Sequence, residues 1–424
     1  MNVLAAYLRL LLLRRRLHRP IAELESIQAQ RVRGLLQHAY AHVPYYRELL
    51  RQAGVQPRDI RSAKDIRHIP VTPQSVLRSI PNDAITARNL DPARCERRRT
   101  SGSQSGNPFH VLVSREEAAE RALVTIRADM ENGYRLWHRQ GFVQRPSFRE
   151  DTWFKRIGIL KSLYVSVFDD LRSQVERLRS FRPVRLAGTP SALERVARYV
   201  VEEKISDLRP RLICTLGERL LPDLRALLER ALAGEVFDRY GATESGILGW
   251  ECARHEGYHL NADQCVVECT HGDDPAPAGE AGAVALTNLC SYVRPLIRVA
   301  VGDVAQLATK PCRCGCAFPV LARVLGRDDE FLHLSSGRWI GPGEVEATFA
   351  GLDGLSSFQL VQEGPGLFRL RVVASDRGLS SARSRARGIV GEEAELRVER
   401  TAEIPLTASG KVRRVVNLTA HAHG

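Results

Sequence analysis

Three stretches that follow closely on one another decide the fold: VRLAGTPSALERVARYV (184–200), RLICTLGERLLPDLRALL (211–228) and EVFDRYGATE (235–244). Each begins with a short segment that contains apolar residues, at 184–187, 211–216 and 235–238, and each of these segments is predicted to be a strand. The segments between these predicted strands have apolar residues at helical spacing. Strand, helix, strand, helix and strand within roughly 55 residues predict a parallel sheet covered by helices.

Capping residues and prolines predict where the helices begin and end. Ser191, followed three residues later by Glu194, has the capping-box pattern of a helix start. Pro222 lies near the start of the second helix, where proline is favoured. An earlier helix is predicted over 21–51, and we expect Pro44 to interrupt it, because proline disfavours helical backbone in the residue before it.

The turn after the third strand is the predicted place for chemistry, because ligands of parallel sheets gather at the carboxyl ends of the strands. It reads Asp-Arg-Tyr-Gly-Ala-Thr-Glu (238–244). The ring of Tyr240 could stack on a base, and Gly241 with Thr243 could admit and bind a phosphate. The carboxylate of Glu244 is a suitable magnesium ligand. A solvated turn of the same composition is the alternative.

Four further motifs are candidates for nucleotide binding: Thr-Ser-Gly-Ser-Gln-Ser-Gly-Asn-Pro (100–108), Gly-Asp (302–303), Gly-Arg-Asp-Asp-Glu (326–330) and Pro-Leu-Thr-Ala-Ser-Gly-Lys (405–411). The small residues of the first motif let backbone amides approach an anion closely. It is not a Walker loop, since no Gly-Lys-Ser/Thr follows and residues 109–113 alternate like a strand. Each motif alone also fits an ordinary loop.

Taken in order, the five motifs across 100–411 resemble those of the adenylate-forming superfamily, which contains acyl-CoA synthetases, adenylation domains and luciferases. Within it, the chain looks most like the phenylacetate-CoA ligase and CapK branch. Four further segments carry that resemblance: His-Val-Pro-Tyr-Tyr (42–46), Ala-Gly-Thr-Pro-Ser (187–191), Arg-Pro-Leu-Ile-Arg (294–298) and Cys-Arg-Cys-Gly (312–315). The resemblance covers nearly the whole chain.

The resemblance implies an α/β fold with two domains. A large multi-sheet N-terminal adenylate-forming domain would span 1–328, with a basic helical segment at 1–60 and zinc-knuckle loops within 252–316. A small, mobile α+β C-terminal domain would span 329–424, with Asp329 at the hinge.

The resemblance also assigns roles to single residues. Residues of the first motif would bind the phosphates of ATP: Thr100, Ser101, Gly102, Ser103, Ser105 and Gly106. Tyr240 would lie against the adenine, Gly241 would also belong to the ATP site, and Asp303 with Arg327 would bind the ribose. The catalytic residues would be Lys411, Thr243, which would bond the α-phosphate, and Glu244, which would bind magnesium. An ammonium group suits the role of Lys411, because attack of a carboxylate on a phosphate brings two anions together. Lys411 is one of only six lysines in the chain.

The predicted activity is ATP-dependent conversion of a carboxylic acid, expected to be aromatic, to acyl-AMP, followed by transfer to coenzyme A. Transfer to an amine or to a carrier-protein thiol is the alternative. The phosphate loop departs from the usual pattern, because Gln104-Ser105 stands where one residue is expected and Asn107 where lysine is common. A degenerate, non-catalytic homologue is therefore a further alternative. Residues lining the acid pocket are expected within 145–170 and 239–246.

The nine cysteines indicate metal binding or reduced thiols, since they cluster and no secretion signal is evident. By resemblance to some relatives of the phenylacetate ligases, Cys252, His259, Cys312 and Cys314 are the predicted ligands of a structural zinc ion. His255 and Cys316 are rival ligands, and free thiols on a loop are the alternative reading. Four protein ligands would leave no open position for catalysis.

The net charge of +13 is concentrated at the N-terminus, where residues 1–100 hold 19 Lys and Arg against 8 Asp and Glu. A chain-wide groove for nucleic acid would not confine its charge in this way, so no nucleic acid is expected. A basic, zinc-containing nucleic-acid-binding protein remains the alternative from another class. The apolar run 3–13 is too short to span a membrane, so it is expected to pack on its own domain or to lie on an anionic membrane. We expect a cytoplasmic protein, and a homodimer is left open.

Overall fold

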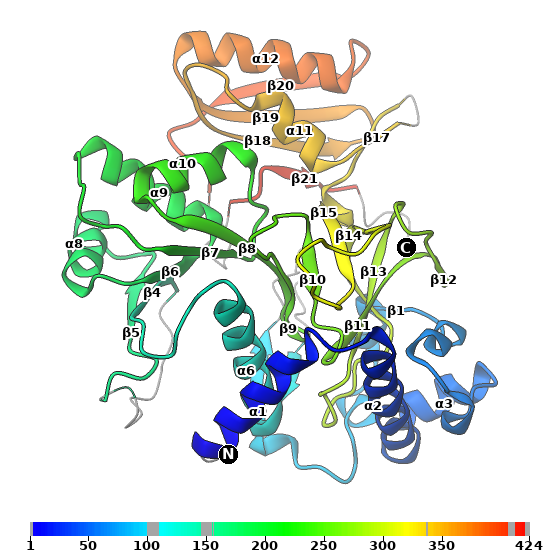
Figure 1. The fold of residues 1–424 in the computed structure, drawn as a ribbon. Helices are drawn as coiled ribbons and strands as arrows, with labels where there is room; N and C mark the ends of the chain where they lie inside the picture. The colour runs from blue at the N-terminus through cyan, green and yellow to red at the C-terminus, as the bar shows by residue number, and fades with distance from the viewer. Residues whose placement is uncertain are drawn as a thin grey trace. The chain divides into compact units, whose positions relative to one another are not determined.

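The computed structural model describes residues 3–99, 110–145, 155, 157–335, 338–405 and 412–419 (Figure 1). Their contacts divide the chain into two compact units. Unit 1 combines Met1–Leu136 with Phe237–Val324, and unit 2 combines Trp137–Val236 with Leu325–Gly424. The predicted α/β class, with a large N-terminal fold and a small α+β C-terminal part, is confirmed.

The N-terminal part of unit 1 is helical. Its helices are α1 (Val3–Arg16), α2 (Ile21–His42), α3 (Pro44–Gln52), α4 (Gln74–Ser79), α5 (Asn82–Ile85), α6 (Arg115–Glu131) and the 3-10 turns η1 (Pro57–Asp59), η2 (Ala63–His68) and η3 (Pro92–Arg94). The predicted interruption is confirmed, because Val43 is extended and Pro44 opens α3 at the position that tolerates its missing N–H. Leu10 and Leu13 of α1 are buried, as predicted for a helix that packs on its own domain.

The remainder of unit 1 is mostly antiparallel sheet. Its strands are β1 (Thr72–Pro73), β2 (Glu96–Arg99), β3 (His110–Val113), β8 (Glu235–Ala242), β9 (Gly246–Trp250), β10 (Tyr258–Leu260), β11 (Cys265–His271), β12 (Asp274–Pro275), β13 (Ala281–Asn288), β14 (Val299–Leu307) and β15 (Val320–Arg327). They lie in the order β12-β11-β13-β14-β15-β10-β9-β8, with β1 beside β14 and a separate β2–β3 pair. β8 runs antiparallel to β9, and β10 runs antiparallel to both β9 and β15. This order sets β8, β9, β10, β15 and β14 side by side.

The first part of unit 2 has the predicted parallel architecture. Its elements are β4 (Gln140–Gln144), β5 (Ser162–Ser166), α8 (Leu171–Phe181), β6 (Arg185–Gly188), α9 (Pro190–Glu202), β7 (Leu212–Leu216) and α10 (Pro222–Leu232). The strands lie in the order β7-β6-β4-β5 and all pair in parallel. Apolar residues of α8, α9 and α10 pack with those of the strands in one core, as the alternating pattern of the sequence predicts.

Two local predictions need correction. Helix α9 begins at Pro190, and its cap is Thr189, whose hydroxyl accepts a hydrogen bond from Ala192 N. Proline at the first helical position fixes this start, so Ser191 lies inside the helix and contacts Glu218 instead. Strand β8 extends to Ala242, beyond the predicted end at 238. Its pairing with β9 draws the first half of the 238–244 motif into the strand.

The C-terminal part of unit 2 has a core of its own. Its elements are η4 (Asp328–Glu330), β16 (Leu332–His333), β17 (Trp339–Ile340), α11 (Pro342–Phe349), β18 (Leu355–Gly364), β19 (Leu367–Ala374), α12 (Asp376–Val390), β20 (Glu395–Arg400) and β21 (Val415–Asn417). The sheet has the order β20-β19-β18-β21. Among the described residues, its apolar core is formed by residues from Leu332 to Val415. That separate core supports the predicted domain boundary at 328/329, which stays a prediction.

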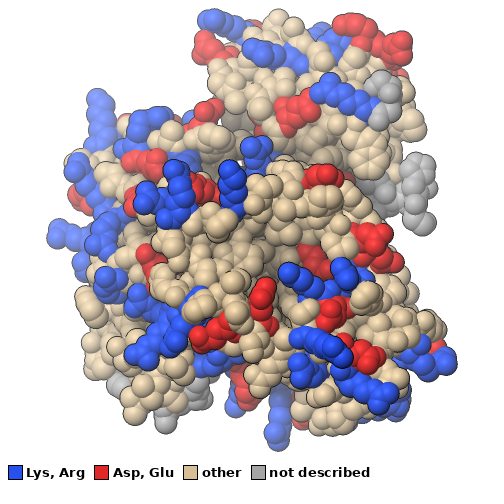
Figure 2. All heavy atoms as spheres, turned by 45° about the vertical axis from the view of Figure 1, so that its right-hand side comes forward, with Lys and Arg blue, Asp and Glu red and all other residues tan. Residues whose placement is uncertain are grey.

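Charged side chains are interspersed on the face of the molecule drawn in Figure 2, where Asp and Glu lie among Lys and Arg. No helix in the part of the chain that the structure describes is both long and apolar enough to cross a membrane.

Candidate active site and metal cluster

Tyr240 and Asp303 meet between strands β8 and β14. The phenolic oxygen of Tyr240 donates a hydrogen bond of 2.7 Å to Asp303 Oδ2. Burial raises the pKa of Tyr240 well above its usual value, and the Asp303 carboxylate raises it further. The phenol therefore keeps its proton and remains a donor, and Asp303 remains its acceptor.

The turn between β8 and β9 carries Thr243 and Glu244. Glu244 is only 4% exposed, and Gln74 Nε2 donates to its Oε1 at 2.5 Å. A carboxylate held in this way is oriented from one side by an amide of α4. Gly241 precedes the turn at a register shift in the β8–β9 pairing, which bends the backbone there.

Arg121 of α6 clamps the backbone of the same turn. Its guanidinium donates to the carbonyl oxygens of Thr243 at 3.0 Å and Glu244 at 2.7 Å. Glu117, one helical turn earlier, accepts from Arg121 at 2.7 Å and so fixes its orientation. Asn288 completes the network, because its Nδ2 donates to Glu117 Oε1 at 2.8 Å and to the Glu244 carbonyl at 2.9 Å.

Sequence reasoning missed the four residues that hold this turn: Gln74, Glu117, Arg121 and Asn288. They come from three regions far apart in the chain. The one local signal is the i, i+4 spacing of Glu117 and Arg121, which also occurs on ordinary solvated helices.

Strand β8, which leads to the motif, is anchored by the loop after β9 and by the first residue of β10. Tyr258 donates a hydrogen bond of 2.6 Å to Asp238 Oδ2. Glu251 accepts from the Asp238 backbone N–H at 2.7 Å and lies 3.3 Å from His255 Nδ1. These contacts hold β8 at Asp238, two residues before Tyr240, against the segment that carries Cys252 of the metal cluster.

Cys252, His259, Cys312 and Cys314 form the predicted cluster: their ligand atoms all lie within 4.8 Å of one another. Cys252 Sγ is 3.7 Å from Cys312 Sγ, and His259 Nε2 is 3.2 Å from Cys314 Sγ. Burial raises the pKa of the Cys252 thiol to about 12 and lowers the pKa of His259. The imidazole is therefore neutral at physiological pH, with Nε2 turned toward the cysteines.

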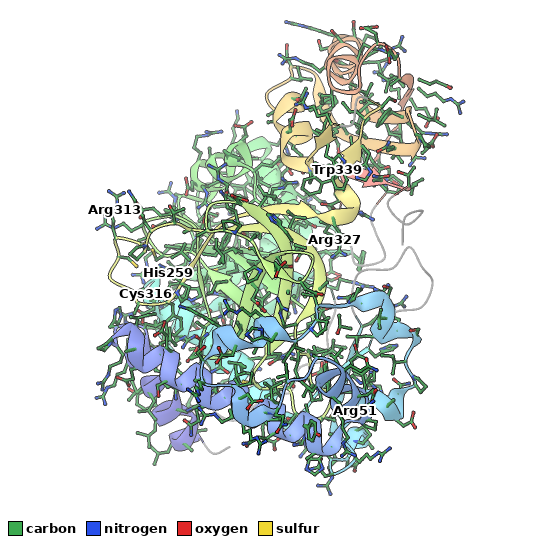
Figure 3. The ribbon with its side chains drawn as sticks, turned by 90° about the vertical axis from the view of Figure 1, so that its right-hand side faces the viewer. Arg51, His259, Arg313, Cys316, Arg327 and Trp339 are labelled. Atoms are coloured by element: carbon green, nitrogen blue, oxygen red, sulfur yellow. The ribbon has the colours of Figure 1, made fainter. Side chains whose placement is uncertain are left out.

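The rival ligands lie outside this cluster in the part of the chain that the structure describes. His255 contacts Glu251 instead, from a backbone with φ of 50°. Cys316 is 5% exposed and packs in an apolar cluster with Trp250 and Phe318. Figure 3 shows His259 and Cys316 close together, with Arg313 farther out on the same loop.

Most of the other predicted nucleotide-site residues do not lie with Tyr240, Glu244 and Asp303 in the described structure. The phosphate-loop residues Thr100, Ser101, Gly102, Ser103, Ser105 and Gly106 lie outside the described residues. So do Lys411, the side chain of Asp329, and residues 146–154 and 156 of the expected acid pocket. Arg327 ends strand β15 in unit 2, where its backbone N–H donates to Glu330 Oε2. The structure therefore brings together Tyr240, Gly241, Thr243, Glu244 and Asp303 in unit 1.

Comparison with curated proteins found relatives along most of the chain. The phenylacetate-coenzyme A ligase of Thermus thermophilus is 25% identical over 441 residues, which cover 94% of this chain and 97% of the relative. That of Escherichia coli is 24% identical and covers 79% of this chain and 78% of its own length. Protein CapK of Staphylococcus aureus is 24% identical over 176 residues, 41% of this chain and 38% of CapK. No family model matches the chain.

Solved structures of adenylate-forming ligases share the fold. 2-Hydroxyisobutyryl-CoA ligase, in its postadenylation state with an acyl-AMP, superimposes with a TM-score of 0.77 at 22% identity, covering 95% of this chain and 91% of that one. Anthranilate CoA ligase with anthranoyl-AMP gives a TM-score of 0.56 at 16% identity, over 76% and 66% of the two chains. The fold predicted from the motifs is confirmed, and the curated relatives support the predicted superfamily and branch.

Proposed function

We propose that this chain activates a carboxylic acid with ATP, forming acyl-AMP and pyrophosphate, and then transfers the acyl group to coenzyme A. The observation that carries the proposal is the contact of Tyr240 with Asp303 beside the buried Glu244. An aromatic ring, a ribose-binding carboxylate and a metal-binding carboxylate thus converge in a fold shared with ligases that are solved with acyl-AMP.

Each of these residues has a role that its chemistry suits. The ring of Tyr240 would contact adenine, and Gly241 would leave room for a phosphate. Asp303 would accept hydrogen bonds from the ribose hydroxyls, and Arg327 would donate to them. Thr243 would donate to the α-phosphate. The Glu244 carboxylate, held on one side by Gln74, fits a magnesium ligand, and magnesium would neutralise phosphate charge when bound. The 100–108 loop would bind the other phosphates through its backbone.

Lys411 is the proposed catalytic residue. An ammonium group beside the acid carboxylate and the α-phosphate stabilises the negative charge that spreads over both as they react. We place it in the C-terminal domain 329–424, which would turn about Asp329 between the adenylation and transfer steps. Such a turn would remove Lys411 before the acceptor enters.

The metal cluster would hold a structural zinc ion. Two thiolates on a tetrahedral zinc with bonds of about 2.3 Å lie roughly 3.8 Å apart, and the sulfur atoms of Cys252 and Cys312 are 3.7 Å apart. Three thiols and one neutral imidazole also form a donor set that zinc prefers. Because all four positions would be filled by the protein, the ion would hold the two loops together.

The acid and the acceptor are proposed from the curated relatives. Several of these are phenylacetate-CoA ligases, which favours an aromatic acid and coenzyme A over an amine or a carrier-protein thiol. The nine free cysteines fit a reducing compartment, and we propose the cytoplasm.

Exchange of labelled pyrophosphate into ATP tests the proposal. A panel of aromatic and aliphatic acids should include at least one that supports exchange by the wild type, and Lys411→Ala should abolish it. Lys310→Ala, at an exposed lysine, is the matched control and should retain exchange. Absence of exchange with every acid would contradict the catalytic proposal. Salt-sensitive binding of nucleic acid without exchange would favour the alternative from the other class.

Products formed with and without coenzyme A identify the acceptor. A thioester that appears only with coenzyme A supports the proposal. If an amide or a loaded carrier protein forms without coenzyme A, the acceptor is an amine or a carrier-protein thiol and not coenzyme A.

A further inference from the structure

We propose that the outer face of α1, formed by Leu4, Leu8, Leu12 and Arg15, docks on an anionic lipid bilayer. This inference goes beyond the proposed function and does not depend on it.

Helix α1 is apolar on two opposite faces. Leu10 and Leu13 are buried against Leu123 and Val124 of α6. A helix needs only one apolar face to pack on its own protein. On the other side, however, Leu4 is 67% exposed, Leu8 53% and Leu12 52%.

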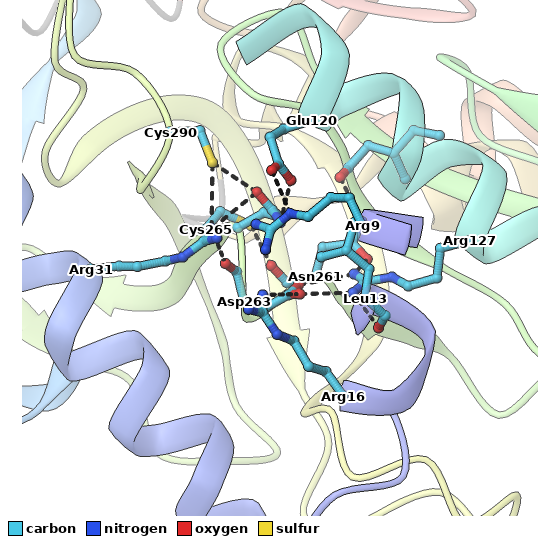
Figure 4. Close-up of polar contacts among 12 residues, drawn as sticks. Arg9, Leu13, Arg16, Arg31, Glu120, Arg127, Asn261, Asp263, Cys265 and Cys290 are labelled. Carbon is cyan, nitrogen blue, oxygen red and sulfur yellow. Dashed lines mark hydrogen bonds and ion pairs between the residues drawn. The ribbon is translucent and has the colours of Figure 1, made fainter. Parts of the chain in front are cut away.

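The orientation of α1 is fixed by ion pairs on its flanks. Arg9 Nε lies 2.7 Å from Glu120, Arg14 Nε 2.8 Å from Glu131, and Arg16 Nη1 3.4 Å from the fully buried Asp263. Figure 4 shows Arg9 and Arg16 directed toward these partners. Since both flanks are tied down, the helix cannot rotate to bury its outer leucines without breaking the pairs.

The outer leucines form one continuous stripe. Positions 4, 8, 12 and 15 follow the spacing of residues on one helix face. Val3, which is 40% exposed, and Tyr7, which is 46% exposed, extend the apolar surface at the N-terminal end. An exposed apolar stripe that is held in place is typical of a contact surface.

The charge around the stripe favours an anionic lipid surface. Of the five arginines in residues 1–22, Arg9, Arg14 and Arg16 pair with acidic residues elsewhere in unit 1 and Arg19 pairs with Glu23, whereas Arg15 ends the stripe as an exposed cation. In both Figure 1 and Figure 3, α1, α2 and α3 lie along the same edge of unit 1. These helices belong to the segment 1–100, in which basic residues exceed acidic ones by 11. Interfacial helices bury their leucines below the lipid headgroups and keep their arginines at the level of the headgroups.

A second copy of the chain fits this surface less well. In such a dimer the basic segments 1–100 of the two copies would face each other, and their like charges would repel. One helix face of three leucines is also smaller than the roughly 800 Å² per partner of a stable interface.

Flotation of the full-length protein with vesicles tests the inference. Wild type should float with phosphatidylglycerol–phosphatidylcholine vesicles and less with pure phosphatidylcholine, and high salt should weaken binding. Leu8→Asp should bind the anionic vesicles at least about ten-fold more weakly. Val201→Asp, at a valine of α9 that is 55% exposed, is the matched control and should bind like wild type.

Circular dichroism and gel filtration of the same variants separate the outcomes. Leu8→Asp should keep the wild-type spectrum, because Leu8 faces away from the core. Leu12→Ser, a milder change on the same stripe, should also weaken binding. Equal binding to both vesicle types, binding to neither, or a dimer that Leu8→Asp dissociates would overturn the inference. None of these readouts uses nucleotide chemistry, so this inference and the proposed ligase activity can fail separately.

Discussion

The phenolic oxygen of Tyr240 donates a 2.7 Å hydrogen bond to Asp303 Oδ2, and this contact joins β8 to β14 at the candidate nucleotide site. The two residues are 63 positions apart in the chain. Because the phenol donates to one carboxylate oxygen, the orientation of the Asp303 carboxylate is defined. The contact therefore couples the residue proposed to contact adenine to the residue proposed to bind ribose.

If Asp303 binds ribose as proposed, Asp303→Ala should raise the KM for ATP by about 10- to 100-fold, because the ribose hydroxyls would lose a charged acceptor. Tyr240→Phe keeps the ring and loses only the contact with Asp303, so its KM should rise several-fold at most. Steady-state kinetics of pyrophosphate exchange at varied ATP would measure both. A larger effect of Tyr240→Phe than of Asp303→Ala would contradict the assigned roles.

Arg121→Met should lower kcat/KM for ATP by about 10- to 100-fold, because two backbone carbonyls of the turn that carries Thr243 and Glu244 lose a charged donor. Arg121→Lys restores one donor and should recover part of the activity. Arg115→Met, at an exposed arginine of the same helix, is the matched control. If Arg121→Met lowers thermal stability while kcat and KM are unchanged, the residue has only a structural role.

The different outcomes of the sequence predictions follow from how far apart the interacting residues lie. The parallel strands β6 and β7 and the break at Pro44 are set by neighbouring residues, so spacing was enough to predict them. The cluster of Cys252 with Cys312 joins two loops that are far apart in the chain, and it was predicted from the resemblance to relatives of the phenylacetate ligases and not from spacing.

The clamp of Arg121 and Asn288 on Glu244 could not be predicted in the same way. Arginine is the common cation of this chain, so no composition signal separates this arginine from the solvated ones. Its function arises only when α6 and β13 bring the side chains to the turn, and that arrangement belongs to the tertiary fold.

The metal cluster gives a prediction that separates the rival ligands. Protein purified without chelator should contain about one zinc ion per chain. Cys314→Ser should lose the metal and lower the Tm by roughly 5 °C or more, because a ligand that binds only the folded state stabilises it. Cys316→Ser should keep the metal, since Cys316 lies outside the cluster. Elemental analysis and thermal unfolding measure both effects, and retention of zinc by Cys314→Ser would exclude the proposed ligand set.

The last prediction concerns the buried ion pair of Arg127 and Asp263 beneath α1 (Figure 4). Both side chains are fully buried, and the two guanidinium nitrogens lie 2.8 and 3.0 Å from the two carboxylate oxygens. Burial acts to raise the pKa of Asp263, but Arg127, Arg16 and Arg31 outweigh it and hold the pKa below its usual value. A depressed pKa means that the carboxylate stabilises the fold above the unfolded pKa of about 3.9 and stops doing so as the pH falls through the folded value.

Arg127→Met should therefore lower the free energy of unfolding at pH 7 by about 3–5 kcal/mol, because it leaves the buried Asp263 carboxylate without its main partner. Asp263→Asn should also destabilise the protein at pH 7, and its stability should fall less than that of wild type as the pH drops below about 4. Asp207→Asn, which breaks the exposed pair with Arg179, is the control and should unfold close to wild type at both pH values. Urea unfolding at a series of pH values measures these differences. Parallel pH profiles for wild type and Asp263→Asn would show that folding does not lower the pKa of Asp263.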